Sequence, residues 1–125
     1  MNKNYTLGII GYGNMAKAIL KGLTAAESAP KIIVSDIDSA LFPKSDGKIK
    51  FTTDNAALAR EADIILFAVK PNCAEDAARL IGDAVSCKTV VSIMAGISIK
   101  TLGGFMPSAK YIIRVMPNLC ATALM

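Results

Sequence analysis

The sequence predicts an α/β fold in which a doubly wound parallel sheet lies between two layers of helices. Short apolar runs alternate with segments of helical periodicity along the whole chain, the pattern of repeated βαβ units. One run, residues 63–69, is almost continuously apolar, as expected for a central parallel strand covered on both faces. A length of 125 residues fits a single domain with a sizeable core.

The first half of the chain contains three expected strands and two expected helices. Residues 14–25 form the first helix, because apolar residues recur there at spacings of three and four. A second helix follows Asp54, a favourable N-cap, and ends near residue 61. Residues 42–47 are expected to form a loop or a helix end. The strands are apolar runs bounded by turn residues, at 6–11, 31–35 and 49–52.

The second half repeats the alternation. The central strand 63–69 is ended by Pro71, and the restriction that proline imposes on its predecessor keeps Lys70 extended. Ser98 is a further N-cap and opens a short helix. The remaining elements expected here are helices at 75–81 and 99–102 and strands at 89–93 and 110–115.

Composition excludes several classes of function. The chain is 53% hydrophobic and 19% charged, so it packs a core and is not disordered. Its net charge of +4 is spread along the chain, and its aromatic residues are four Phe and three Tyr, which argues against a nucleic-acid-binding surface. No signal peptide or membrane-spanning segment is recognisable. We therefore expect a soluble cytoplasmic protein with no membrane or nucleic-acid partner.

The chain has no histidine, which limits its chemistry. A zinc site is not expected, because the three cysteines also lack a C-x-x-C spacing. Ser-His and Cys-His pairs and an imidazole base are excluded. A redox reaction carried out here must need little proton abstraction, or another part of the enzyme supplies the acid or base. The sequence identifies no catalytic residue.

The most informative motif is a G-x-G-x-x-A turn at residues 11–16, between the first strand and the first helix. In a dinucleotide-binding turn, Gly11 allows the tight turn and Gly13 lets the backbone approach a pyrophosphate. Ala16 lets the helix pack closely on its strand. The N–H groups and the positive dipole end of the helix then face the phosphates. On its own, without the flanking strand and helix, the motif fits a plain strand–helix turn equally well.

Four more segments follow expected strands and should meet the glycine turn at one edge of the sheet. Asp36 stands twenty positions after Ala16, where a carboxylate binds the ribose 2′-OH of NAD; a capping or turn role is an equal alternative. The segments are Ser35–Asp36, 68–71, 94–96 and 116–118. Together they predict a Rossmann-type nucleotide-binding edge.

In these segments the chain resembles the N-terminal cofactor-binding domain of the pyrroline-5-carboxylate reductases. The resemblance covers essentially the whole chain, so residues 1–125 are expected to form one NAD(P)-binding domain. It is carried by four segments in order, at residues 11–16, 68–71, 91–97 and 114–118. It implies reduction of the C=N bond of 1-pyrroline-5-carboxylate to L-proline with hydride from NADP or NAD in reduced form. Such an imine substrate is already electrophilic, so the lack of histidine is no obstacle.

The resemblance also implies which residues hold the cofactor. Ser35 and Asn55 would lie near the adenosine ribose or its 2′-phosphate, although Asn55 also fits a simple first-turn helix residue. For Lys70 a backbone role is favoured over one for its amine. Asn118 would lie near the nicotinamide and the substrate. The pyrophosphate would be held by Ile10, Gly11, Tyr12, Gly13, Asn14 and Met15, and the path to the nicotinamide would be lined by Ala68, Val69, Lys70, Pro71, Met94, Ala95 and Gly96.

The chain departs from the family pattern in three places. Many members carry an Asn-Arg pair where this chain has Ser35-Asp36, and a carboxylate repels a 2′-phosphate, so NAD becomes competitive with NADP. Leu119 and Cys120 replace the usual Thr-Pro after Asn118. The chain ends at Met125, where the family's helical second domain begins. In the family that domain forms the homo-oligomer and most of the substrate site, so we expect a fragment with little reductase activity alone.

The sequence is also compatible with two other functions. The domain is a non-catalytic nucleotide-binding regulatory module, or it belongs to a related NAD(P)-dependent oxidoreductase with another substrate. A reductase acting on an alcohol or its oxidised form needs a general base, and Lys70 is the one candidate this chain offers.

Overall fold

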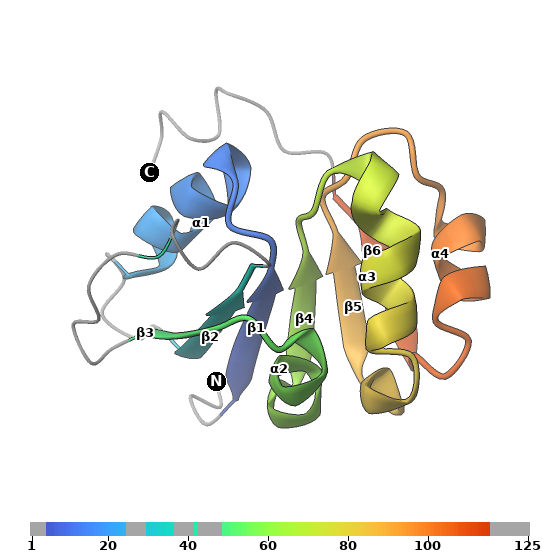
Figure 1. Cartoon of the computed structure of the whole chain (residues 1–125), viewed down its shortest axis with the longest axis horizontal. Helices are drawn as coiled ribbons and strands as arrows, with labels where there is room; N and C mark the ends of the chain where they lie inside the picture. Colours follow the sequence, from blue (N-terminus) through green and yellow to red (C-terminus); the bar gives the residue numbers. More distant parts are fainter. Residues whose placement is uncertain (1–4, 25–29, 37–41, 43–48, 116–125) are drawn as a thin grey trace.

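A computed structural model of the chain describes residues 5–24, 30–36, 42 and 49–115. Six parallel strands form one sheet in the order β3-β2-β1-β4-β5-β6 (Figure 1). The chain runs outward from β1 to β3, then returns to the centre and runs outward the other way. The switch point between β1 and β4 is where such sheets bind ligands. The strands are β1 (Thr6–Ile10), β2 (Lys31–Ser35), β3 (Ile49–Thr52), β4 (Ile64–Phe67), β5 (Thr89–Ser92) and β6 (Tyr111–Arg114).

Helices lie on both faces of the sheet, which gives the predicted three-layered Rossmann-type fold. On the front face in Figure 1, α2 (Asn55–Glu61), α3 (Ala74–Leu80) and α4 (Ile99–Phe105) pack over a core that includes Ile65 and Phe67 of β4. On the rear face α1 (Asn14–Thr24) packs over the inner strands. Side chains alternate between these two cores along each strand, as the pleat requires.

The expected elements agree closely with the observed ones. Strands β2 and β3 have the predicted bounds, and Asp54 caps α2 by accepting the N–H of Ala57. Most of the others differ by one residue at one or both ends, and larger differences occur in three places. The central strand is shorter than 63–69, because the chain turns away after Phe67 toward a 3-10 turn, η2 (Pro71–Cys73). Helix α4 continues through two glycines to Phe105, and a second 3-10 turn, η3 (Asp83–Val85), was not predicted. Of the expected loop at 42–47, residues 43–47 lie outside the described residues.

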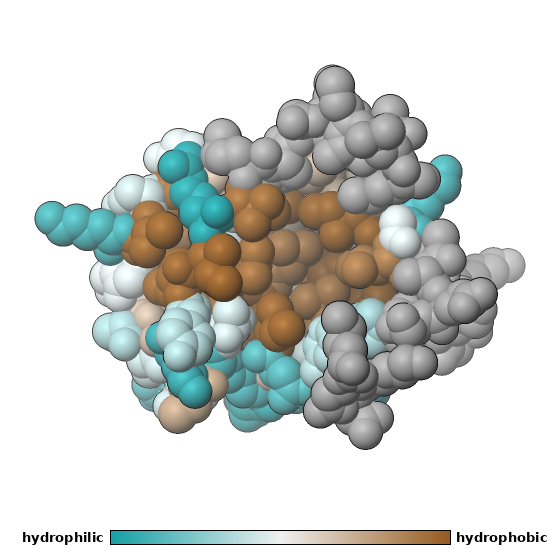
Figure 2. Space-filling view, turned by 180° about the vertical axis from the view of Figure 1, so that it is seen from behind, coloured by the Kyte–Doolittle hydropathy of each residue, from teal (hydrophilic) through white to brown (hydrophobic). Residues whose placement is uncertain are grey.

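The rear face is broadly hydrophobic where β5 and β6 run (Figure 2). Tyr111, Ile113 and Val115 are about half exposed there. Ile113 pairs in register with Val91, which is only partly buried. Within the described part of the chain, α1 is the one helix on this face, and it packs on the other half of the sheet. Both faces of a parallel sheet are normally covered, so this half is unusual in its exposure.

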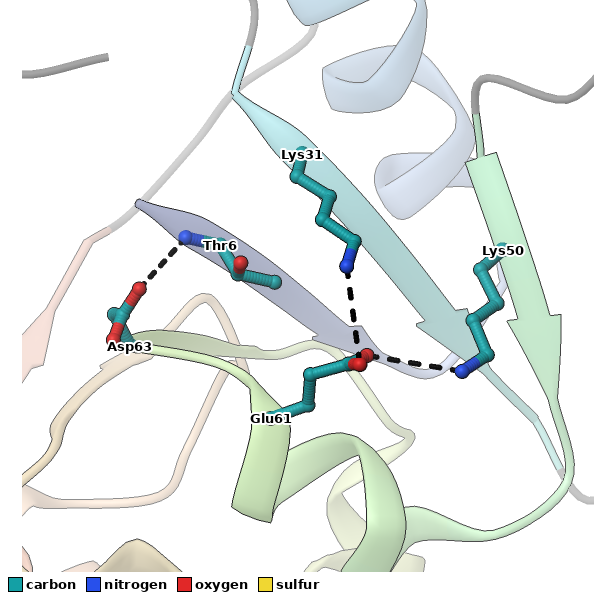
Figure 3. Close-up of polar contacts among 5 residues, drawn as sticks. All are labelled: Thr6, Lys31, Lys50, Glu61 and Asp63. Atoms are coloured by element: carbon teal, nitrogen blue, oxygen red, sulfur yellow. Dashed lines mark hydrogen bonds and ion pairs between the residues drawn. The ribbon is translucent and has the colours of Figure 1, made fainter. Parts of the chain in front are cut away.

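Polar contacts lie at the edge of the sheet that is formed by the amino-terminal ends of the strands (Figure 3). Glu61 lies 3.8 Å from the ammonium groups of both Lys31 and Lys50. Asp63 accepts the backbone N–H of Thr6 at 2.8 Å. These contacts are exposed and add little stability each, but they lie away from the carboxyl ends of the strands. No described helix is long and apolar enough to span a bilayer.

Candidate functional site

The glycine turn lies where the sequence predicts, directly after β1 at the carboxyl edge of the sheet. Gly11 has a φ of 101°, and a Cβ there would lie 2.6 Å from the carbonyl oxygen of Ala68. Its N–H donates to the carbonyl of Ser35 at 2.8 Å. The turn is therefore held between the ends of β2 and β4, and a side chain at position 11 would collide with backbone. This is a physical requirement for glycine.

Gly13 has a different reason to be glycine. A Cβ at this position would have no other atom within 4 Å, so the absent side chain leaves open space above the loop. Helix α1 begins at the next residue, has no acidic residue in its first turn, and packs on the sheet through Ala16, which is buried. Unpaired N–H groups and the helix dipole make such a place favourable for a phosphate.

A cavity of about 570 Å³ opens beside the turn at the switch point between β1 and β4. This volume is typical of a site for a cofactor or another small molecule. Nine of the residues that line it were predicted as cofactor-binding from the sequence; these are Ile10, Gly11, Tyr12, Gly13, Asp36, Asn55, Ala68, Val69 and Lys70. The structure thus brings together the ends of β1, β2 and β4 with the start of α2.

Asp36 has the turn-bracing role that the sequence offered as one alternative, and it also lies where a bound ligand could reach it. One of its carboxylate oxygens accepts the N–H of Tyr12 at 2.8 Å, which braces the glycine turn. The residue also lines the cavity. Its own N–H donates to the carbonyl of Thr52, the last residue of β3. An acidic group is consequently placed at the end of β2, beside the turn.

Ser35 and Asn55 lie together, but only one of them reaches the cavity. Ser35 is completely buried and donates its hydroxyl hydrogen to the Asn55 side-chain oxygen at 2.6 Å. Asn55 is 7% exposed and lines the cavity. The sequence predicted that both residues lie beside a ligand. In the structure Asn55 lines the cavity, whereas Ser35 is buried behind Asn55 and does not line it.

The segment after β4 forms another wall of the cavity. Lys70 is exposed and extended, with φ −63° and ψ 144°, as the following Pro71 predicts. Four lining residues are not among those predicted from the sequence and come from the next turn and helix: Cys73, Asp76, Ala77 and Leu80. The helical period of residues 75–81 was a usable signal, because a helix that follows a central strand borders the switch point.

Other predicted residues lie at the same edge but outside the cavity lining. Met94 is 3% exposed and belongs to the front core. Ala95 and Gly96 are exposed, and Gly96 has a φ of 76°. Asn14, Met15 and Pro71 flank the cavity at the start of α1 and of η2. Asn118 lies outside the described residues.

An aromatic cluster that the sequence did not indicate supports the turn from the β3 side. The ring of Tyr12 lies 5.6 Å from that of Phe51, and Phe51 lies 5.1 Å from Phe42. The Lys17 ammonium is 5.0 Å from the Tyr12 ring centroid, within the range of a cation–π contact. The residue between the two glycines is thus packed through its ring and hydrogen-bonded through its backbone.

Comparison with curated proteins finds relatives that share most of this chain. It is 34% identical over 125 residues to a pyrroline-5-carboxylate reductase of Methanosarcina acetivorans, covering 96% of this chain and 46% of the relative. It is 40% identical over 117 residues to that of Haemophilus influenzae, covering 90% and 42%. The chain therefore spans just under half the length of the curated relatives it matches.

Solved structures agree. The pyrroline carboxylate reductase of Plasmodium falciparum with NADP bound superposes with a TM-score of 0.83 at 30% identity, over 97% of this chain and 45% of that one. The pyrroline-5-carboxylate reductase of Coxiella burnetii gives a TM-score of 0.86 at 29% identity, over 96% and 46%. The fold is therefore shared with this group of reductases along nearly the whole chain.

Residues 6–96 match the family described as NADP oxidoreductase, coenzyme F420-dependent. This match includes the glycine turn, Asp36 and the end of β4. The relatives described above confirm the resemblance to the pyrroline-5-carboxylate reductases. Because the family match covers well over half of the chain, the chain belongs to this NADP oxidoreductase family, whose members are NAD(P)-dependent oxidoreductases.

Proposed function

We propose that residues 1–125 form the NAD(P)-binding domain of a pyrroline-5-carboxylate reductase, in which this chain supplies the cofactor-binding half. The observation that carries the proposal is the open space over Gly13, at the start of α1 and continuous with the cavity. A turn that only connected a strand to a helix would require neither the open space over Gly13 nor the cavity beside it. The relatives' names supply the substrate, a small imine.

The residues fit a dinucleotide in extended form. The pyrophosphate would lie over Gly13, where backbone N–H groups and the helix dipole stabilise its charge. The adenosine ribose would lie beside Asp36 and Asn55, both of which line the cavity. The nicotinamide would extend past Ala68 toward the end of β5. When bound, the reduced cofactor supplies hydride, and this chain's role is to bind and orient it.

The carboxylate of Asp36 favours NADH over NADPH in this proposal. An ionised carboxylate accepts hydrogen bonds from a free ribose hydroxyl but repels a phosphate at the same place. The Plasmodium falciparum structure binds NADP, so both cofactors are tested.

The binding half of the proposal is tested by titrating the purified chain with NADH and NADPH and following nicotinamide fluorescence. The variant to compare with the unmodified chain is Gly13→Ala. A Cβ at this position contacts no neighbouring protein atom, so it should block a phosphate without disturbing the fold. We expect saturable binding that Gly13→Ala reduces at least tenfold while the melting temperature is retained. The proposal fails if the unmodified chain binds neither cofactor, or if Gly13→Ala binds as well as the unmodified chain.

The catalytic half is tested by adding 1-pyrroline-5-carboxylate and following NADH or NADPH oxidation. We expect cofactor binding with little turnover, because the chain spans just under half of its relatives. Extending the reading frame beyond residue 125 should restore turnover. Binding of cofactor with no imine reduction by the extended protein would favour a regulatory nucleotide-binding module.

A cytoplasmic location and a homo-oligomeric full-length enzyme are also part of the proposal. Cell fractionation tests the location, and sedimentation tests the oligomeric state.

A further inference from the structure

A buried hydroxyl lies directly beneath the adenosine end of the proposed site. Ser35 is the last residue of β2 and is completely buried. Its hydroxyl donates to the Oδ1 atom of Asn55 at 2.6 Å. Ser35 does not line the cavity, whereas Asn55 does. Any effect of Ser35 on a ligand therefore passes through the Asn55 amide.

The backbone of Asn55 is held independently of Ser35. Asn55 is the first residue of α2, and the preceding Asp54 caps that helix by accepting the N–H of Ala57 at 3.1 Å. The N–H of Asp54 in turn donates to the Thr52 hydroxyl at 3.0 Å. With the backbone fixed, the remaining freedom is the rotation of the amide group, whose two ends are an acceptor and a donor.

We propose that Ser35 is a positioning residue that sets this rotation and thereby the hydrogen-bonding character of the cavity. In this structure the Ser35 hydroxyl donates to Oδ1, which leaves the NH₂ group of Asn55 as the end of the amide that can donate to a ligand in the cavity. The adjacent Asp36 presents only acceptor oxygens when ionised. A donor beside an acceptor complements the vicinal hydroxyls of a ribose, one of which accepts from Asn55 while the other donates to Asp36. This inference rests on the proposed function, since it assigns the ribose of that dinucleotide.

The test compares two probes, 5′-ADP and 2′,3′-dideoxy-ADP, by calorimetry. Removing the hydroxyl in Ser35→Ala frees the amide to rotate, and Ser35→Cys removes the strong donor at nearly constant volume. We expect both variants to bind 5′-ADP about three- to tenfold more weakly, the value of one hydrogen bond. Their binding of 2′,3′-dideoxy-ADP should equal that of the unmodified chain. Ser35→Thr, which keeps a hydroxyl, should restore 5′-ADP binding.

A double-mutant cycle identifies the route of the effect. Asn55→Ala should weaken 5′-ADP binding to a similar degree, and adding Ser35→Ala to Asn55→Ala should cause no further loss. Equal weakening for both probes would mean that Ser35 only supports packing, and an additive double variant would mean that it acts without Asn55; either result overturns the inference. If the unmodified chain binds neither 5′-ADP nor NADH, the proposed function itself fails, which is a separate outcome.

Discussion

The Asp36 carboxylate accepts the backbone N–H of Tyr12 at 2.8 Å. This bond joins the end of β2 to the turn between β1 and α1, so the residue beside the proposed ribose position also fixes the loop proposed to hold the pyrophosphate. A replacement for Asp36 that keeps the turn must therefore supply an acceptor oxygen for the Tyr12 N–H. Its charge and its hydrogen bond have separate effects, which substitution can distinguish.

Asp36→Asn should change cofactor preference while keeping the turn intact. Asparagine retains an oxygen that accepts the Tyr12 N–H, but it lacks the charge that repels a 2′-phosphate. We expect the affinity for NADPH relative to NADH to rise about tenfold, equivalent to about 1.4 kcal/mol. The measurement is a pair of fluorescence titrations at fixed ionic strength. Asp83→Asn, on η3 at the opposite edge, is the charge-matched control. An unchanged ratio in Asp36→Asn would disprove the electrostatic assignment.

Gly11→Ala should destabilise the protein strongly. The backbone at position 11 has a φ of 101°, and the added Cβ would lie 2.6 Å from the Ala68 carbonyl oxygen. Left-handed strain and displacement of β4 together should cost about 2–4 kcal/mol of unfolding free energy, measured by urea denaturation. Gly104→Ala is the control, because position 104 lies in α4 with no atom within 4 Å of its Cβ. It should stabilise by about 0.5–1 kcal/mol, and a similar loss in both variants would refute the steric argument.

The sequence predicted the fold well because apolar runs bounded by turn residues mark parallel strands clearly. β2 and β3 have the expected bounds. It predicted less well where a helix ends, since Gly103 and Gly104 usually stop a helix, yet α4 continues to Phe105. Burial of Leu102 and Met106 in the front core holds this last turn. That tertiary packing is not readable from local propensity.

The site was predictable as an edge of the sheet but not in its detail. The placement of Met94 was available from strand alternation, because Val90, Ser92 and Met94 share one face of β5 and its extension, and all three are buried. The burial of Ser35 also follows this rule, whereas its bond to Asn55 depends on how α2 docks. Likewise, which face of α3 borders the cavity is decided by packing rather than by periodicity.

Lys88→Met should destabilise the fold without affecting the site. The Lys88 ammonium donates to the carbonyl oxygens of Ala59, Arg60 and Ala62 at 2.7, 2.6 and 2.5 Å. It therefore caps the C-terminal end of α2, where a cation also complements the helix dipole. We expect a loss of about 1–3 kcal/mol by urea denaturation. NADH affinity should be unchanged, because Lys88 lies just before β5, at the edge of the sheet opposite to the cavity.

The control for this change is Lys100→Met, an exposed lysine in the first turn of α4. It should alter the unfolding free energy by less than about 0.5 kcal/mol. If Lys88→Met is as mild as Lys100→Met, the three carbonyl contacts add no net stability. If Lys88→Met weakens NADH binding while the protein is fully folded, the expectation that this edge of the sheet does not affect the cavity is wrong.

Two neighbouring isoleucines of β6, Ile112 and Ile113, should differ in how much stability the same substitution costs. Ile113 is 48% exposed on the hydrophobic rear face, whereas Ile112 packs against the front core and α4. Threonine preserves the β-branched shape that strands favour. Ile112→Thr places a hydroxyl against the core and should cost about 1–3 kcal/mol, while Ile113→Thr should change the unfolding free energy by less than about 0.5 kcal/mol.

Ile113→Thr should also reduce self-association at high protein concentration. The rear surface combines Ile113 with exposed Tyr111 and Val115, and contiguous apolar surface promotes association. Sedimentation velocity across a concentration series, at equal folded fraction, measures the effect. Since the cavity lies at the carboxyl ends of β1, β2 and β4, NADH affinity should be the same for Ile113→Thr and the unmodified chain. An unfolding free energy that falls equally in both threonine variants would show that the rear face of β6 is covered.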